Sequence, residues 1–384
     1  MRTFTALLLL ALTLWTPVAH KAHADEVTGI WDGVVSLRGN YYWERSTRVT
    51  APAISAKLVS PEGVRYSADY LLDAISSASL ATGVADDIAF TETRHDGSLG
   101  VGYEFGGEQV QLDVDVRGRV SHEPDYLSLG AGFSGVLSLA QRNTLIGLHG
   151  YYLRDDVGKV ARNASPSSPA ELEADNRLDV GYLDALSLGM RIDQILRRDL
   201  LVYVAYDLAL LHGVQQNVYR IVARNDNDMP IEAETHPEQR IRPAIQVGAA
   251  YHLTRTGSTL KLSYRYYRDS WKILSHSPAL RLYQELGPHL QLRANYRYYT
   301  QSGAFFHRPD GYAMDDVYFT ADPKMTPFTG HNMGMQARVS LGVLEGGPLH
   351  LLHGAVIDFS YVLVLRTNAF GNGVLAQGGI SLPF

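Results

Sequence analysis

The stretch VQLDVDVRGR, residues 110–119, alternates between apolar and polar side chains. Successive side chains of a β-strand point to opposite faces, so this stretch predicts a strand with one aliphatic face and one charged face. The aliphatic positions are Val110, Leu112, Val114 and Val116, and the polar ones are Gln111, Asp113, Asp115 and Arg117. A soluble sheet rarely repeats this contrast along a whole chain.

The same period of two recurs in the rest of the chain, over segments of about ten residues each. Further segments of this kind begin at Leu127, Leu186, Ile245, Leu260, Leu290, Met333 and Ile357. An aliphatic face toward lipid and a polar face toward the interior are typical of a transmembrane β-barrel. We therefore predict an all-β, antiparallel transmembrane barrel. A soluble periplasmic β-sandwich is the alternative, but its outward faces would have to be polar.

Short and long connections alternate along the chain, as they do in outer-membrane barrels. Short periplasmic turns are predicted at 60–63, 105–108, 140–143, 194–199, 254–258, 285–288 and 344–348. The long external loops include 74–89, 155–179, 213–240 and 302–330. This order predicts about sixteen strands, an even number, with both ends on the periplasmic side. The segment Arg48 to Ser60 is the least secure strand, because Pro52 lacks a backbone donor.

Both ends of the chain carry export signals. Arg2, an apolar run from Ala6 to Trp15, and Ala22-His23-Ala24 have the order of a secretory signal peptide. We expect cleavage after Ala24, with residues 1–24 as the signal and 25–384 as one barrel domain in the bacterial outer membrane. A membrane anchor is the alternative, but the run is half the length of a spanning helix. The last segment alternates up to Phe384 and resembles the assembly signal that the barrel insertion machinery reads.

The composition excludes several classes of protein. The chain has no cysteine, which excludes disulfides, thiol enzymes and cysteine-ligated metals. Its formal net charge of -6 shows no basic excess, so nucleic acid is a poor candidate partner. Beyond the signal, no apolar stretch is long enough for a spanning helix. We expect no cofactor and no metal, and the lipid bilayer as the first partner.

Tyrosine and tryptophan are frequent at the predicted outer ends of strands, where they are expected to form an aromatic girdle at the membrane interface. An aromatic stacking site for sugars is the alternative. These residues are Tyr41, Tyr42, Trp43, Tyr151, Tyr152, Tyr266, Tyr267, Tyr298 and Tyr299.

The predicted inward face carries many charges of both signs, which must be paired or hydrated. Part of this set is a candidate selectivity zone, in which opposed charges create a transverse field. Structural cross-strand pairing is the alternative. The candidate residues are Asp113, Asp115, Arg117, Arg119, Arg265, Arg293, Arg297 and Arg338.

The connection from Ser302 to Gly330 is long and aromatic, and is a candidate plug or gate of the barrel. Its candidate residues are Phe305, Phe306, His307, Asp310, Asp315, Asp316, Asp322 and Pro323. The carboxylates could instead hold a hard cation such as calcium, but the spacing matches no EF-hand loop, and solvated charge is the default. Asn225 to Asp228 is expected to be a flexible turn without a site.

Six segments resemble the DUF3570 family of uncharacterised outer-membrane barrels. They are YYWE (41–44), DAISSAS (73–79), ETR (92–94), SHEPDY (121–126), RYYTQ (297–301) and TADPK (320–324). The resemblance implies an outer-membrane barrel of the Gram-negative envelope and brings no catalytic residue. It also suggests exported redox proteins as partners.

Three functions follow from these features. The first is a pore or selective passage for small polar solutes, because a barrel of this size leaves an aqueous interior. The second is a sealed structural or partner-binding barrel that serves an envelope complex. The third is a hydrolase, with Ser121, His122 and Asp125 or Ser275 and His276 as candidates. Sequence neighbours on a strand point to opposite faces, and no nucleophile elbow or zinc motif is present, so we expect no enzyme.

Overall fold

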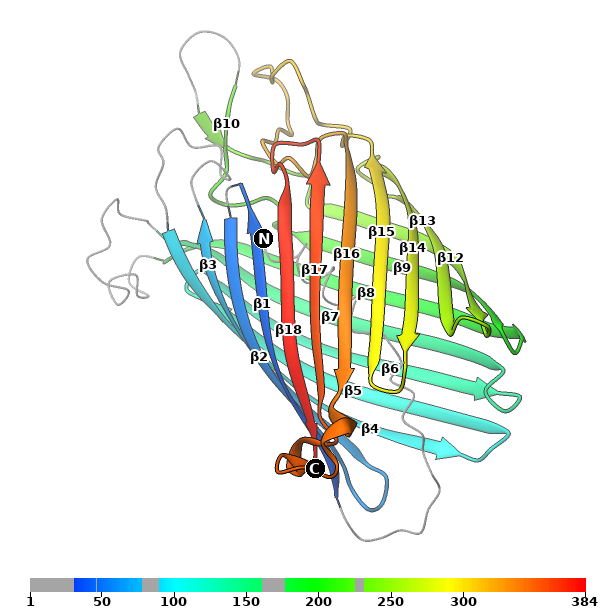
Figure 1. Ribbon diagram of the computed structural model, residues 1–384. Coiled ribbons are helices and arrows are strands. Elements are labelled where there is room, and N and C mark those ends of the chain that lie inside the picture. The colour runs from blue at the N-terminus through cyan, green and yellow to red at the C-terminus, as the bar shows by residue number, and fades with distance from the viewer. Residues whose placement is uncertain (1–30, 46, 78–89, 161–176, 225–230) are drawn as a thin grey trace.

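Sixteen antiparallel strands close into a single barrel in the computed structural model (Figure 1). The structure describes residues 31–45, 47–77, 90–160, 177–224 and 231–384, so the predicted signal peptide and the turn at 225–228 lie outside the described residues. The barrel strands are β1 (Asp32–Glu44), β2 (Thr47–Val59), β3 (Arg65–Ser77), β4 (Phe90–Gly106), β5 (Val110–Glu123), β6 (Tyr126–Leu139), β7 (Thr144–Val160), β8 (Arg177–Arg197), β9 (Leu200–Gly213), β12 (Gln239–Leu253), β13 (Ser258–Arg268), β14 (Leu274–Leu286), β15 (Leu290–Gln301), β16 (Phe328–Ser340), β17 (Val356–Arg366) and β18 (Gly373–Pro383). The predicted fold class and strand number are confirmed.

The seam of the barrel joins the first strand to the last. β1 pairs with β18 from Val34 opposite Pro383 to Glu44 opposite Gly373. The backbones of Gly33 and Phe384 then exchange two hydrogen bonds of 2.9 Å each. Closure satisfies the backbone groups that an open sheet would expose at its edges.

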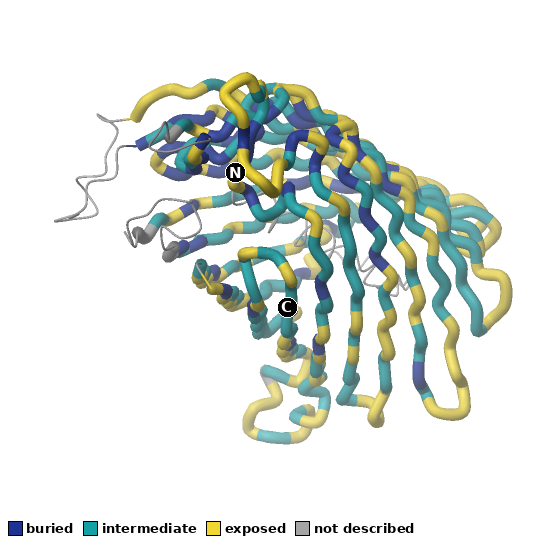
Figure 2. The backbone as a smooth tube through the Cα atoms, turned by 90° about the horizontal axis from the view of Figure 1, so that it is seen from above, coloured by how far each residue is buried: buried dark blue, intermediate teal, exposed yellow. Residues whose placement is uncertain are grey.

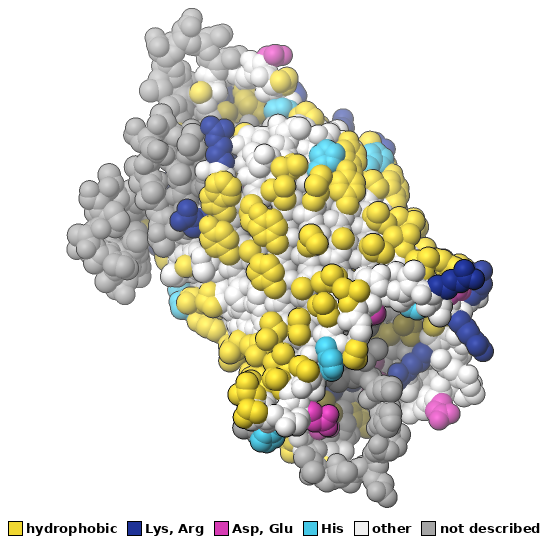
Figure 3. All heavy atoms as spheres, in the orientation of Figure 1, with side chains coloured by type: hydrophobic (Ala, Val, Ile, Leu, Met, Phe, Trp, Pro, Cys, Tyr) yellow, Lys and Arg dark blue, Asp and Glu magenta, His cyan; other side chains and the backbone are white. Residues whose placement is uncertain are grey.

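The outside of the barrel is apolar. Val116 and Leu99 are 53% and 70% exposed, although soluble proteins rarely leave large connected apolar surfaces in water. Figure 3 shows hydrophobic side chains across the middle of one face, with Lys, Arg, Asp and Glu at its margins. Seen from above, exposed and half-buried residues alternate along the strands (Figure 2). This is the surface of a transmembrane barrel.

The two ends of the barrel differ in their connections, as predicted. Short turns and the 3-10 helices η4 (Leu341–Leu344) and η5 (His350–Leu352) lie at one end, and the long connections lie at the other (Figure 1). The β16–β17 connection spans 341–355 and is longer than the predicted turn at 344–348. Among the described residues, no helix has the length and hydropathy needed to cross a membrane.

Several strands are longer than the expected ten residues or so. β4 and β7 have 17 residues each and β8 has 21, and the β7–β8 pairing runs from Thr144 opposite Gln194 to Val160 opposite Arg177. Pro52 lies inside a complete strand, β2. The β2–β3 register runs from Thr50 opposite Ala74 to Ala53 opposite Leu71 and leaves Pro52 unpaired on that side, so its missing donor is tolerated.

Candidate functional site

Charged side chains face the lumen on β3, β4 and β5, where they form ion pairs between strands. Arg119 pairs with Asp96 and Arg94 with Asp73. These pairs join neighbouring strands through hydrogen-bonded carboxylates, which satisfies charges that would otherwise be costly in a confined space.

Two of the remaining predicted selectivity residues on β5 pair with β3. Asp113 binds Arg65, and Arg117 lies 3.3 Å from Asp69. Asp115 lies on the same face between them and has no cation within ion-pair distance in the described part of the chain. The strand singled out by sequence therefore supplies a nearly neutral network, not a set of free charges.

The other predicted selectivity residues lie on a different wall. Arg265 on β13 is 3.4 Å from Asp207 of β9. Arg293, Arg297 and Arg338 lie on β15 and β16, and none of them forms an ion pair with a described carboxylate. The structure thus divides the predicted zone into a paired group and an unpaired group.

Two long connections pack against each other at one end of the barrel. Residues 214–224 and 231–238, with the hairpin of β10 (Ile221–Ala223) and β11 (Ile231–Ala233), contact residues 302–327, and we call these segments together the loop assembly. Thr235 and Phe319 form a β-bridge between them. The guanidinium of Arg224 donates to the carbonyls of Ala313, Met314 and Asp316 at 2.7–2.9 Å.

A buried carboxylate, Glu234, lies at the centre of the loop assembly. Its side chain has 0% exposure, and Arg220 lies 3.4 Å from it and 3.0 Å from Asp322. Glu234 also accepts hydrogen bonds from the Asn217 amide at 2.9 Å and the Thr320 hydroxyl at 3.0 Å. This network fixes both connections to one another, and Asp322 is the only one of its three charged members that the sequence analysis had singled out.

Burial and charge act differently on the titratable groups of this network. Burial raises the pKa of Glu234, against the attraction of Arg220. Burial also acts to raise the pKa of Asp322, but Arg220 and Lys324 hold it below its ordinary value. Burial lowers the pKa of His236 to about 4, so this imidazole is neutral near pH 7.

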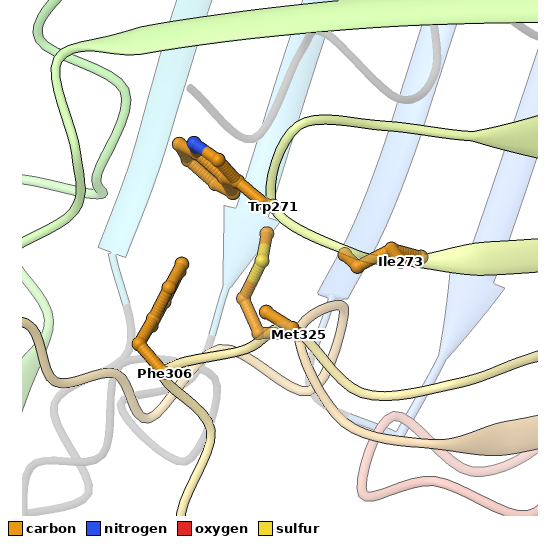
Figure 4. Close-up of a cluster of buried hydrophobic side chains, with 5 residues drawn as sticks. Trp271, Ile273, Phe306 and Met325 are labelled. Atoms are coloured by element: carbon orange, nitrogen blue, oxygen red, sulfur yellow. The ribbon is translucent and has the colours of Figure 1, made fainter.

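An apolar cluster supports the loop assembly from the barrel rim. Trp271, which is 1% exposed, and Ile273 of the β13–β14 connection pack with Ala304, Phe306 and Met325. Figure 4 shows these side chains converging from both connections. The Trp271 ring also contacts His236, with centroids 5.3 Å apart.

The predicted gating residues do not share one environment. Phe306 and Asp322 are buried, His307 and Asp316 are half-buried, and Pro323 is held by a hydrogen bond from Thr326 to its carbonyl at 2.8 Å. The solvent-exposed ones are Phe305, Asp310 and Asp315. In the described residues, no group of three His, Asp or Glu side chains is placed to hold a metal.

His236 makes the loop assembly sensitive to pH. When the assembly opens, His236 regains an ordinary pKa near 6.5, so the open form binds a proton that the closed form rejects. The contribution of His236 to the stability of the closed assembly is therefore fully present above about pH 6.5, and up to about 3 kcal/mol is lost as the pH falls toward 4. Glu234, whose pKa burial raises, contributes in the opposite direction, so the effect of His236 is measured against a variant that lacks the imidazole. The readout is acrylamide quenching of Trp271 in a protein whose Trp31 and Trp43 are replaced by Phe, and we expect the quenching to rise more as the pH falls over this range than it does in His236→Phe.

His236→Phe in the same background is the control, because Glu234 and Asp322 titrate in both proteins. The variant should lack the increase in quenching that belongs to the imidazole. Superimposable quenching curves for the two proteins would contradict this role of His236.

The candidate hydrolase residues face different environments. Ser121 is 1% exposed on the lumen side, whereas His122 is exposed on the opposite face of β5. Asp125 accepts a hydrogen bond from Tyr219. Ser275 is buried, and His276, on the other face of β14, is 2.6 Å from the Tyr264 hydroxyl. Neither serine thus has its neighbouring histidine as a base.

The predicted aromatic girdle is correct for only some of its residues. Tyr41, Trp43 and Tyr152 are exposed on the outer face. Tyr266 and Tyr298 share that face, because they pair with His276 and His331. The others, Tyr42, Tyr151, Tyr267 and Tyr299, point into the lumen, since adjacent residues of a strand alternate in direction.

Comparison with known proteins gives one family match. The family model described as "Protein of unknown function (DUF3570)" matches residues 85–345. No curated protein matches the chain.

Solved structures with a similar outline include three from Pseudomonas aeruginosa. OccK2 (OpdF) has 10% identity and a TM-score of 0.43, with 92% of this chain and 97% of that chain covered. OprD has 10% identity and a TM-score of 0.45, with coverage of 92% and 95%. The siderophore receptor PirA has 11% identity and a TM-score of 0.43, with coverage of 88% and 56%. Likeness at this level supports no conclusion about function.

Proposed function

The chain belongs to the DUF3570 family, whose members are described as proteins of unknown function, and from its barrel we propose that it is an outer-membrane pore for small polar solutes. The observation that supports this proposal is the lumen itself. Its wall carries arginine, lysine and carboxylate side chains on most strands, and such groups require water or partners. Barrels of sixteen to eighteen strands enclose an aqueous channel unless loops fill it.

The proposed location follows from the sequence and from the apolar exterior. Residues 1–24 would be removed during export, and residues 25–384 would form the barrel, inserted by machinery that reads the strand ending at Phe384. The long connections and the loop assembly would face outward, since outer-membrane barrels keep their short turns in the periplasm. We propose no catalytic activity, because the histidine next to each candidate serine lies on the opposite face of its strand.

A second function is favoured by the loop assembly. Its ion-paired centre and apolar support give it the character of a folded lid, and a lid that covers the mouth would make this a gated pore or a sealed barrel that binds an envelope partner. The predicted gating residues 305–323 belong to this lid. These possibilities can be distinguished by comparing the conductance of the intact barrel with that of a barrel whose loop assembly is shortened.

The test is single-channel conductance of residues 25–384, refolded and inserted in a planar bilayer, beside a variant in which a short Gly-Ser linker replaces 304–326. Steady current from the intact protein is the expected result. No current from the intact protein together with current from the variant would identify the loop assembly as the gate. No current from either protein, in samples whose circular dichroism shows an intact barrel, would contradict the pore and favour the sealed barrel.

A further inference from the structure

One wall of the lumen is strongly basic. The inward positions of β12 to β16 carry eight cations and a single carboxylate, Glu285, among the described residues. The cations are Arg240, Arg242, Lys261, Arg265, Arg281, Arg293, Arg297 and Arg338.

Most of these cations form no ion pair within the described part of the chain. Arg240 is paired with Asp269, and Arg265 with Asp207. The other six form no ion pair with any carboxylate that the structure describes. Lys261, Arg281 and Arg338 are exposed to the lumen, so their N–H donors are available to a solute.

Tyrosine rings brace three of these side chains without neutralising them. The Lys261 ammonium lies 4.8 Å from the ring centre of Tyr283. The Arg297 guanidinium lies 5.5 Å from the ring of Tyr299 and donates to the Ser277 hydroxyl at 2.9 Å.

Arg242 is the third braced cation, and its Nε donates to the Tyr267 hydroxyl at 3.1 Å. Stacking on an aromatic face orients a cation and leaves its charge intact. A charged side chain that is already held in one orientation loses less conformational entropy when it binds an anion.

The basic wall faces the paired wall across the barrel. In the closed ring of strands, β15 and β14 lie eight places from β5 and β4, which is half of the circumference. On β3, β4 and β5 each of Arg65, Arg94, Arg117 and Arg119 is paired with a carboxylate. The field therefore points across the lumen, since six cations of the basic wall form no ion pair with a described carboxylate, whereas these four arginines of the opposite wall are paired.

The unpaired cations also extend along the pore. Arg242 is near the start of β12, at the end of the barrel with the long connections. Arg281 and Arg297 lie near the middle of their strands, and Lys261 and Arg338 lie near the end with the short turns. A solute that is bound to one cation therefore has other cations of the same wall above or below it along the pore.

We propose that the unpaired cations of the basic wall bind small oxyanions, carboxylates or phosphates, and make the pore selective for anions. Both groups match the planar, bidentate donors of arginine. The selectivity rests on the proposed pore function, whereas the binding of oxyanions to the wall is independent of conduction.

The test compares the wild-type barrel with Arg281→Gln/Arg297→Gln. In a planar bilayer with a tenfold KCl gradient, the reversal potential should show chloride preferred over potassium, and the double variant should lose most of this preference. The control is Arg65→Gln/Asp113→Asn, which removes an ion pair on the opposite wall without changing its net charge. This control should keep the wild-type selectivity.

A second measurement does not need current. Titration calorimetry of the detergent-solubilised barrel with succinate, and separately with inorganic phosphate, should show binding that is about tenfold weaker in the double variant. The two ligands reveal whether carboxylate or phosphate is preferred.

The outcomes separate the two proposals. Current without anion preference, or equal preference in wild type and double variant, would overturn the selectivity and leave the pore intact. If the wild type carries no current but binds oxyanions, and the double variant loses this binding, the result would support oxyanion binding by the basic wall and contradict the pore. If the wild type binds neither succinate nor phosphate, the proposed oxyanion binding by the basic wall is wrong.

Discussion

Arg220→Met is expected to destabilise the loop assembly by about 3 kcal/mol, the lower end of the range for breaking a buried ion pair. The substitution leaves the buried carboxylates of Glu234 and Asp322 without the guanidinium between them. The loss stays at the lower end because Asn217 and Thr320 still donate to Glu234. Native-state hydrogen exchange of the amides in 231–238 and 302–327 measures the opening free energy directly.

A surface pair in the same assembly provides the control. Arg308 is 3.8 Å from Asp316 and about half exposed, so Arg308→Met should cost about 0–1 kcal/mol. Adding Glu234→Gln and Asp322→Asn to Arg220→Met should restore part of the lost stability, because neither carboxylate is then left buried without the Arg220 guanidinium. Equal exchange in Arg220→Met and Arg308→Met would show that the buried network does not hold the loops together.

Val116→Arg is expected to destabilise the whole barrel in a bilayer by about 2–4 kcal/mol. Val116 is the seventh of the 14 residues of β5 and faces outward, so its replacement would place a guanidinium at the middle of the apolar band. The urea midpoint for unfolding from lipid vesicles, followed by tryptophan emission, gives the change in free energy.

The matched control lies on the same face of the same strand. Val110 is the first residue of β5, at the end of the barrel with the short turns, where an arginine reaches the interface and costs about 0–1 kcal/mol. Val110→Arg should therefore unfold at nearly the wild-type midpoint. Similar losses in both variants would contradict a membrane-spanning exterior for β5.

The strands were predictable because their signal is local. The alternation around Val116 assigns a direction to each side chain of β5 without knowledge of its neighbours, and the same rule places Asp113 and Arg117 on the lumen side. The rule also applies to Tyr41 and Tyr42, where grouping adjacent tyrosines into one girdle was wrong for the inward members.

The loop assembly was not predictable from residue pattern. Arg220, Glu234 and Asp322 come from two connections that are about ninety residues apart, and only the folded chain brings them together. The same is true of the contrast between the two walls. Arg119 and Arg297 are both inward arginines in sequence, and only register shows that one meets Asp96 and the other meets a serine.

The seam between β1 and β18 sets an order in time. Its contacts join residues such as Ser36 and Ser381, which are 345 positions apart, so the first strand cannot find its second neighbour until the last has been made. The entropy cost of closing so long a loop is only modestly larger than that of a shorter one, but contacts between residues so far apart in sequence form slowly. Until then both edges can pair with other chains. A chain that lacks β18 would leave β1 and β17 as unpaired edges, so it would form an open sheet and not a closed barrel of fifteen strands.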